Sequence, residues 1–382
     1  MINRTYKYRL YPTKNQRMKL DTTIDTCRIL YNSALLDRIN RYKNTGKGLS
    51  YNEQASIVVK DKEKHECLNK VYAQILQDVL RRVDKAFANF FRRLKQKHTK
   101  AGYPRFKGED RLHSFAYPQK GFSIEDNKLK LSKIGSIKLK LHRELNGKIK
   151  TCTIKKEIDR WYVCFIVEIE KNIIKKVVSN PIGIDVGIKN FATLSNGDTI
   201  ENPKYLRKSE DRLTRAQKLL SRKKKGSHNR RKQRTLVAKQ HRKIKNQRLD
   251  FHHKVSKELV NKYDLIAHED LNIKGMVKNH NFAKSISDVG WGQFVGFVKY
   301  KAEEAGIYAI PINPRNTSQL CSHCGQVVKK DLSVRVHKCS YCGLELDRDH
   351  NAALNILNKA WNEPLLRDKV LNLPVEARNS YS

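Results

Sequence analysis

The sequence is short of acidic residues and of long apolar runs. Its 38 Asp and Glu stand against 79 Lys and Arg, so the 382 residues carry a formal net charge of +41. The longest uninterrupted hydrophobic run covers only residues 161–167, and residues 1–16 contain no apolar segment of the kind found in a signal peptide. Secretion and membrane spanning are therefore not expected, and we expect a cytoplasmic protein.

The excess of positive charge predicts a polyanionic partner. A hydrophobic content of 39%, with 16 Tyr and 12 Phe, is enough for two or three folded domains with cores, so the charge does not indicate a disordered chain. Positive residues are spread along the whole chain instead of lining one amphipathic helix. This distribution favours nucleic acid over a membrane surface.

One basic block stands out in residues 221–248, where thirteen residues are Lys or Arg and none is acidic. Few solvated helices carry charge of one sign only. The block either forms a helical hairpin that lies on a phosphate backbone or becomes ordered only when the polyanion binds.

The first half of the chain predicts a small β-barrel or sheet interrupted by helices. Residues 5–11 alternate apolar and basic side chains as a half-buried strand does, and Pro12 ends the pattern. Apolar residues then recur at helical spacing over residues 16–42 and 75–94. Strand patterns return after residue 107, with lysines on their solvent side, which we interpret as a nucleic-acid contact surface rather than an ordinary solvated face.

The second half predicts an α/β domain. Residues 171–180 are polar and charged, and beyond them strand and helix patterns alternate, so we place a domain boundary near Asn180.

The eight cysteines divide into four scattered ones and two tight pairs. The pairs are Cys321-Ser-His-Cys324-Gly and Cys339-Ser-Tyr-Cys342-Gly, with fourteen residues between them. Two such knuckles complete a tetrahedral four-thiolate site for a structural zinc ion, in a reducing compartment. Two buried or redox-active pairs are the alternative. Weaker substitute ligands are His323, His337 and His350.

Three acidic residues occur in three separate predicted elements. Asp185 interrupts the middle of an apolar strand over residues 181–194, and its buried charge needs a lysine, a backbone nest or, most simply, a divalent cation. Glu269 follows the apolar run 265–268, at the carboxyl end of a strand. Asp349 lies in the first turn of a helix that Asp347 caps, directly after the second knuckle.

Any one of these acids alone would be interpreted as a helix cap or a surface residue. Together they predict a constellation for two magnesium or manganese ions, which cleave a phosphodiester by activating water and stabilising the leaving oxygen. We therefore predict Asp185, Glu269 and Asp349 as catalytic metal ligands.

With these residues identified, the chain resembles the TnpB family of RNA-guided nucleases, which are encoded by insertion sequences and related to type V CRISPR effectors. The resemblance runs nearly end to end and rests on the order and number of short motifs. These are Tyr6-Lys-Tyr-Arg-Leu-Tyr-Pro12, Ala86-Phe-Ala-Asn-Phe-Phe91, Gly102-Tyr-Pro-Arg-Phe-Lys107, Gly183-Ile-Asp-Val-Gly187, Phe251-His-His-Lys-Val-Ser256, Glu269-Asp-Leu-Asn272, Asn316-Thr-Ser-Gln-Leu-Cys321 and Asp347-Arg-Asp-His-Asn-Ala-Ala353.

The resemblance implies a multidomain α+β architecture. It places an N-terminal wedge β-barrel at residues 1–14 and 98–180, interrupted by a helical recognition domain at 15–97. A RuvC-like nuclease domain of the RNase H type follows at 181–318 and 345–365, with a zinc ribbon inserted at 319–344 and a tail at 366–382. The metal-binding acids of the family fall on Asp185, Glu269 and Asp349.

The resemblance further implies guided cleavage of double-stranded DNA beside a short target-adjacent motif, with a guide RNA transcribed from the end of a transposable element in a prokaryote. Base pairing then carries most of the sequence information, and the protein contacts mainly phosphates. Two alternatives stay open. One is a guided DNA-binding regulator without nuclease activity, and the other is a transposase that catalyses strand transfer itself.

Overall fold

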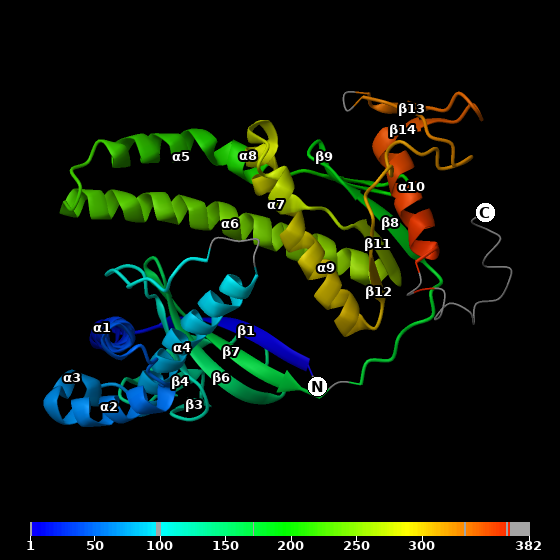
Figure 1. The fold of residues 1–382 in the computed structure, drawn as a ribbon. Helices are drawn as coiled ribbons and strands as arrows, with labels where there is room; N and C mark the ends of the chain where they lie inside the picture. Colours follow the sequence, from blue (N-terminus) through cyan, green and yellow to red (C-terminus); the bar gives the residue numbers. More distant parts are fainter. Residues whose placement is uncertain (1, 97–100, 171, 332–333, 364–365, 367–382) are drawn as a thin grey trace. The chain divides into compact units, whose positions relative to one another are not determined.

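The computed structural model describes residues 2–96, 101–170, 172–331, 334–363 and 366. The chain divides into two compact units, Met1–Asn172 and Ile173–Ser382 (Figure 1). The division precedes Asn180 because residues 173–180 pack with the second unit. The backbone N of Lys176 donates to Gly306 O at 2.8 Å, and that of Ser179 donates to Asp264 Oδ2 at 2.7 Å. Apart from Leu366, the expected tail lies outside the described residues.

The first unit contains a seven-stranded sheet in which every pairing is antiparallel. Its spatial order is β2-β6-β7-β1-β5-β4-β3. The strands are β1 (Ile2–Tyr11), β2 (Ser114–Tyr117), β3 (Phe122–Glu125), β4 (Lys128–Leu131), β5 (Gly135–Lys140), β6 (Lys148–Glu157) and β7 (Arg160–Ile169).

This sheet is nearly closed and barrel-like. Its two edge strands, β2 and β3, are consecutive in the chain, so residues 118–121 connect one edge to the other. Tyr117 Oη donates to Ser132 O at 3.0 Å, and Ser132 N donates to Gly121 O at 2.8 Å. Alternate side chains fill the interior, as the sequence pattern predicted for β7, where Trp161, Val163 and Phe165 are buried.

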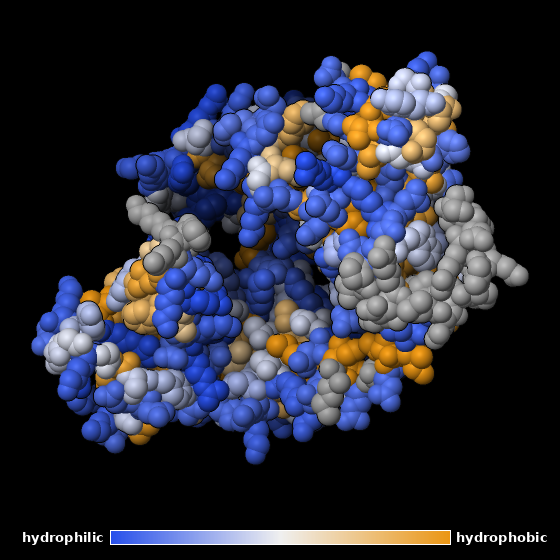
Figure 2. Space-filling view, turned by 45° about the vertical axis from the view of Figure 1, so that its right-hand side comes forward, coloured by the Kyte–Doolittle hydropathy of each residue, from blue (hydrophilic) through white to orange (hydrophobic). Residues whose placement is uncertain are grey.

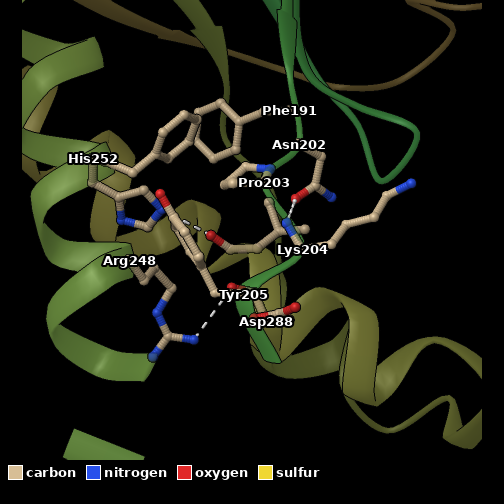
Figure 3. Close-up of a pocket in the computed structure, with 10 residues that line it drawn as sticks. Phe191, Asn202, Pro203, Lys204, Tyr205, Arg248, His252 and Asp288 are labelled. Atoms are coloured by element: carbon tan, nitrogen blue, oxygen red, sulfur yellow. Dashed lines mark hydrogen bonds between the residues drawn. The ribbon is translucent and has the colours of Figure 1, made fainter. Parts of the chain in front are cut away.

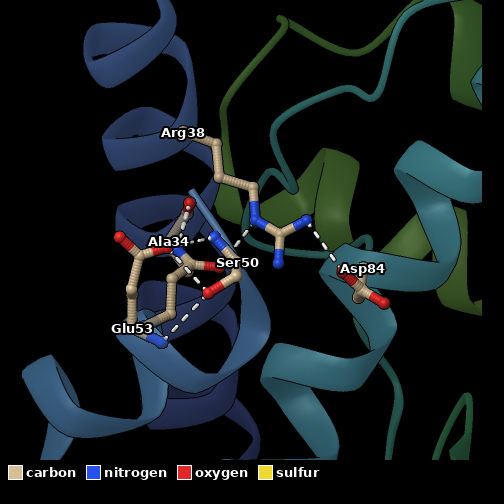
Figure 4. A network of polar contacts seen from close by, with 6 residues as sticks. Ala34, Arg38, Ser50, Glu53 and Asp84 are labelled. Atoms are coloured by element: carbon tan, nitrogen blue, oxygen red, sulfur yellow. Dashed lines mark hydrogen bonds and ion pairs between the residues drawn. The ribbon is translucent and has the colours of Figure 1, made fainter. Parts of the chain in front are cut away.

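Four helices interrupt this sheet between β1 and β2: α1 (Lys14–Thr45), α2 (Tyr51–Lys64), α3 (Glu66–Asn69) and α4 (Ala73–Lys95). α1 and α4 confirm the two helical patterns. The buried Arg38 of α1 joins three of the helices, because its Nε donates to Gln54 of α2 at 2.7 Å and its Nη1 pairs with Asp84 of α4 at 3.1 Å (Figure 4). A capping box of Ser50 and Glu53 begins α2.

The second unit is built on a mixed five-stranded sheet with the order β10-β9-β8-β11-β12. β8, β11 and β12 are parallel, whereas β9 and β10 are antiparallel to their neighbours. The strands are β8 (Pro181–Val186), β9 (Asn190–Leu194), β10 (Thr199–Glu201), β11 (Leu265–Glu269) and β12 (Tyr308–Ile312).

The expected single strand over residues 181–194 is wrong, because the chain forms a hairpin of β8 and β9 there. Gly187 makes the turn, and its backbone N donates to Phe191 O at 3.2 Å. Apolar residues continue on both sides of this turn, so the hydrophobic pattern alone did not reveal it. Asp185 is consequently near the carboxyl end of β8 rather than in the middle of a strand.

Helices cover both faces of this sheet. On one face, Ile182, Ile184 and Ile266 pack with side chains of α6 (His228–Lys262), α8 (His280–Val289) and α9 (Trp291–Ala305). On the other face, Leu265 and Ala267 pack with α10 (Arg348–Trp361). A short helix, α7 (Ile273–Met276), lies between β11 and α8 in the chain.

The basic block is folded in the structure: residues 221–248 cover the end of one helix, a turn and the first part of a second helix. α5 (Tyr205–Ser221) and α6 are antiparallel neighbours that share a small apolar seam at Leu213, Val237 and Ile244 (Figure 1). Arg230 closes the connection by donating to Leu220 O at 2.7 Å and to Lys223 O at 2.9 Å.

Hydrophilic residues cover most of the side of the molecule that Figure 2 shows, as the high content of charged residues requires.

The base of the α5–α6 hairpin is anchored in the second unit around the buried His252. Its Nε2 lies 2.9 Å from Val289 O, and its ring packs beside Phe191 and Phe294 (Figure 3). Asp288 accepts from the backbone N of Leu206 at 3.1 Å, at the start of α5. None of the helices in the described part of the chain is both long and apolar enough to cross a membrane.

Candidate active site and cysteine cluster

Asp185 and Glu269 lie at the same edge of the second sheet. β8 and β11 are parallel neighbours whose register pairs Gly183 with Ala267 and Ile184 with His268. Asp185 and Glu269 each follow immediately after the last of these pairs. Residues at equivalent positions of parallel strands share one face, so the two carboxylates are carried side by side at the carboxyl ends of their strands.

Asp349 reaches this edge because α10 packs unusually close to β8. A Cβ added to Gly183 would lie 2.2 Å from Ala353 O of α10, so only glycine permits the approach. Asp347 caps the helix by accepting from the backbone N of Asp349 at 2.9 Å and of His350 at 3.1 Å, as predicted. Asp349 therefore stands in the first helical turn, above the strand that carries Asp185.

Asp185 interacts electrostatically with the other two acids. Burial raises the pKa of the Asp185 carboxyl well above its ordinary value, and the neighbouring charges of Glu269 and Asp349 raise it further. Burial also raises the pKa of Glu269, against the opposing effect of a hydrogen bond from Thr317. Such mutual repulsion is relieved by a cation between the carboxylates.

Two arginines lie beside Asp349. Arg348 donates to Asp349 Oδ1 from Nε at 3.2 Å and from Nη2 at 3.0 Å, while Arg335 Nη1 lies 3.9 Å from Oδ2. The charge of Arg348 opposes the rise in the pKa of Asp185 without cancelling it. Among the described residues the acids do not form a group whose ligand atoms all lie within 4.8 Å of one another.

Sequence reasoning missed the partners of the acids. Thr317, which is buried, donates to Glu269 Oε1 at 2.6 Å. Its position within the motif Asn316-Thr-Ser-Gln-Leu-Cys321 was the only available signal, and no role followed from it. His350 Nε2 lies 3.1 Å from Ser195 O, which joins α10 to the turn after β9.

The four paired cysteines come together in a second cluster. The sulfur of Cys321 lies 3.6 Å from that of Cys342, and the sulfur of Cys324 lies 3.5 Å from that of Cys339. All four sulfurs lie within 4.8 Å of one another, which is the arrangement of a structural metal site. The predicted substitute ligands do not join this group, since His337 lies against Lys330 and His350 against Ser195.

The four thiols influence one another strongly. Burial raises the pKa of Cys339, but the backbone N–H groups of Cys342 and Tyr341 and the neighbouring thiols lower it, to a net value of about 6. A backbone hydrogen bond from Leu344 lowers the pKa of Cys342, but burial and the other three thiols raise it, to a net value of about 12. The thiolate is the form that binds a metal ion. A two-stranded sheet of β13 (Val336–Lys338) and β14 (Glu345–Asp347) completes the ribbon around the cysteines.

Two buried asparagines of α10 connect the ribbon to the acids. Asn351 Nδ2 donates to Leu320 O at 2.8 Å, and Asn351 Oδ1 accepts from Ser322 N at 3.0 Å. Asn355 Nδ2 donates to Thr317 O at 2.9 Å. The helix that carries Asp349 therefore also holds the first cysteine knuckle and the residue that orients Glu269.

Comparisons with known proteins identify the family of this chain. Residues 164–280 match the OrfB_IS605 family, described as "Probable transposase", and residues 291–356 match the Cas12f1-like TNB domain. A protein of Streptomyces pristinaespiralis, named as a candidate RNA-guided DNA endonuclease, is 34% identical over 93% of this chain and 89% of its own length. InsQ of Escherichia coli strain K12, with the same description, is 30% identical over 92% of this chain and 91% of its own length.

Among solved structures, the protein in a Cas12f1–sgRNA–target DNA complex shares the fold. Its TM-score is 0.56 with 15% sequence identity, over 94% of this chain and 99% of that one. The fold is therefore that of compact Cas12f1-like proteins, and the family matches place the chain among proteins of insertion sequences. Within that class, the extent and identity of the sequence matches show that the chain belongs to the TnpB family.

One match differs from the structure. Residues 1–47 match a helix-turn-helix domain of the same family. The described residues of this segment form the strand β1 and the single long helix α1, without a second helix. The name of that domain therefore does not describe the conformation of this segment.

Proposed function

We propose that this protein is an RNA-guided DNA endonuclease of a transposable element, and that it hydrolyses phosphodiesters with divalent cations held by Asp185, Glu269 and Asp349. The observation that carries the proposal is the placement of these acids at the ends of β8 and β11 and at the start of α10, where burial first and then the charges of Glu269 and Asp349 raise the pKa of Asp185. The names of the two full-length relatives support guided DNA cleavage as the reaction.

The residues fit magnesium or manganese. The acids supply hard oxygen ligands, and a cation would relieve the repulsion that raises the pKa of Asp185. When bound, two such ions supply an activated water and stabilise the leaving oxygen. Asp185, which interacts electrostatically with both other acids, is the candidate for bridging the ions.

The other residues of the site position these ligands. Thr317 orients the Glu269 carboxylate through its hydroxyl, and the Asp347 cap fixes the start of the helix that carries Asp349. Arg348 balances part of the charge of Asp349. Each contact restricts a side chain that would otherwise lose entropy on binding a metal or a phosphate.

We further propose zinc at Cys321, Cys324, Cys339 and Cys342. Four thiolates leave no open coordination position, so this ion would be structural. Its role is to hold the ribbon against α10 and so to keep Asp349 and Thr317 in place.

The proposed partners are a guide RNA and double-stranded target DNA. The α5–α6 hairpin and the lysine-rich strands supply positive charge on folded, exposed elements, which suits recognition of phosphates while base pairing reads the sequence. We propose four domains. They are a wedge barrel (1–14 and 98–180), a helical recognition domain (15–97), a RuvC-like nuclease domain of the RNase H type (181–318 and 345–365) and the ribbon (319–344). The proposed site of action is the prokaryotic cytoplasm, with association with the nucleoid when the protein is bound to DNA.

The test uses the protein with its copurified RNA, a plasmid that carries the complementary target, and magnesium. Wild type is expected to cut the plasmid. Asp185→Ala is expected to reduce the cutting rate by at least about a thousandfold, because it removes the ligand shared by both ions. RNA content and zinc content should stay unchanged in the variant.

Other outcomes would identify the alternatives. Tight target binding by wild type without any cut would favour a guided regulator. The description of the OrfB_IS605 family as a transposase favours a strand-transfer enzyme as the second alternative. Joined or excised transposon ends made by this protein alone would support that alternative.

A further inference from the structure

Two motifs in the first unit take no part in the site described above, and the structure brings them together. Ala86-Phe-Ala-Asn-Phe-Phe91 lies in the last turns of α4, and Gly102-Tyr-Pro-Arg-Phe-Lys107 follows in the segment before β2. The Tyr103 ring lies 5.1 Å from Phe90 and 5.6 Å from Phe87, between ring centroids. Phe91 lies 5.3 Å from Phe90. We call Phe87, Phe90, Phe91 and Tyr103 the aromatic cluster.

The cluster is anchored on its inner side. Phe87 packs against the core of the first unit, and the guanidinium carbon of Arg38 lies 5.4 Å from its ring centroid. The segment that carries Tyr103 is held to α1 because the backbone N of Lys107 donates to Asn32 Oδ1 at 2.7 Å and Asn32 Nδ2 donates to Lys107 O at 2.9 Å. The rings are thus presented by a fixed support.

The outer side of the cluster is exposed. Phe91 retains 54% of its accessible surface and Tyr103 retains 47%. Phe106, in the same segment as Tyr103, retains 52%. Adjacent exposed rings at one place are unusual on a soluble protein surface and indicate a binding site.

Charge identifies the occupant. Residues 86–107 include seven Lys or Arg and no acidic residue, and the exposed Arg92 and Arg93 directly follow Phe91. A ligand must therefore offer flat apolar faces together with negative charge. Unpaired nucleobases on their phosphate backbone have both properties, and stacking on rings with neighbouring cations is the usual way in which single strands bind.

We propose that the aromatic cluster is a stacking platform for unpaired nucleobases, with Phe91 and Tyr103 as the contact residues. The proposal deepens the proposed function, since it assumes a nucleic-acid partner, but it does not depend on cleavage. The unpaired base belongs either to RNA or to a separated DNA strand, and the experiment distinguishes these sources.

The experiment measures affinity by fluorescence anisotropy with the full chain, stripped of RNA and kept in EDTA. Four probes of equal length are single-stranded RNA, single-stranded DNA, an abasic DNA strand and duplex DNA. Phe91→Ala is expected to weaken binding of single-stranded RNA, single-stranded DNA or both about tenfold. Binding of the abasic strand and of the duplex should not change, because neither offers unpaired bases.

Two variants serve as controls. Tyr42→Ala removes an exposed ring with basic neighbours, Arg41 and Lys43, from α1, outside the aromatic cluster. This variant should leave all four affinities unchanged. Phe91→Trp keeps a flat ring and should retain the preference for base-bearing strands. Thermal unfolding of Phe91→Ala should match wild type, since half of this side chain is already exposed.

Three results would overturn the proposal: no loss of affinity in Phe91→Ala, an equal loss for abasic and base-bearing strands, or a change of oligomeric state in sedimentation without a change in binding. The last would assign the cluster to contact with another copy of the chain. A protein that fails to cut DNA but shows the base-dependent loss would contradict only the proposed nuclease activity.

Discussion

The second unit contains two clusters of metal-ligand residues that differ in how they are assembled. The four cysteines come from two turns eighteen residues apart in sequence, and their sulfurs already lie within 4.8 Å of one another. The three acids come from β8, β11 and α10, and they come near one another only through the pairing of β8 with β11 and the close contact of α10 at Gly183.

The difference fits what each cluster is proposed to bind. Thiolates in a closed tetrahedron need no further ligand, so local turns are sufficient. Carboxylates that serve phosphodiester chemistry must leave positions for water and phosphate. This openness leaves the charges of Glu269 and Asp349 near the buried Asp185, and Thr317 and Arg348 hold two of the acids.

The largest expected effect tests the closed cluster. Cys339→Ser should abolish zinc binding and expose the ribbon to protease, because structural zinc supplies most of the folding free energy of such small modules. Metal content by atomic emission and limited proteolysis check this outcome. Cys67→Ser, which removes an exposed cysteine outside the cluster, is the matched control. A Cys339→Ser protein with full zinc content would contradict the assignment.

The next effect tests the open cluster. Glu269→Gln keeps the side-chain shape but removes the charge, and the cutting rate should fall at least about a thousandfold. Asp270→Asn, at the adjacent exposed position, should leave the rate unchanged. Equal losses in both variants would show that general charge near β11, rather than a specific ligand, supports the reaction.

A pH experiment tests the packing around the buried His252, which supports the sheet that carries Asp185 and Glu269. Burial lowers the pKa of His252 to about 4, from an unfolded value near 6.5, against the opposing effect of its contact with Val289. The unfolded state therefore binds the proton more tightly. The contribution of His252 to stability is complete above pH 6.5 and is lost as the pH falls toward 4, by about 3 kcal/mol.

Hydrogen exchange of the β9 amides between pH 4.5 and 7 measures this loss. His252→Gln keeps a donor for Val289 O but cannot be protonated, so its protection should vary less with pH. The same slope in wild type and variant would assign the acid sensitivity to another group.

The smallest effect concerns the orientation of a ligand. Thr317→Val preserves side-chain volume but removes the hydroxyl that donates to Glu269, and the cutting rate should fall about tenfold. Because this hydrogen bond lowers the pKa of Glu269, its loss should also move the acidic limb of the pH–rate profile to higher pH. Thr317→Ser should restore both the rate and the profile; failure to do so would attribute the effect to packing.

Parts of the fold with a strong local pattern were predictable. The alternation in β1 and β7 and the helical spacing of α1, α4 and α10 follow from which side chains can be buried, so the sequence was sufficient. The hairpin of β8 and β9 was not predicted, because its turn at Gly187 is short and lies within a continuous apolar pattern. For the basic block the sequence left two alternatives, and the structure folds it into the turn and the first part of α6, which packs on α5 through a small apolar seam.

The sequence by itself determined the chemistry of this protein: its positive charge, its four cysteines at chelating spacing and the three acids in three separate elements. Tertiary structure alone decided which atoms meet. The partners of the acids, Thr317 and Arg348, and the contact of Phe90 with Tyr103 are long-range or side-chain contacts that no local period encodes. The physical reason is that spacing along a chain specifies which side chains share a face, whereas the packing of one element on another sets the distance between faces.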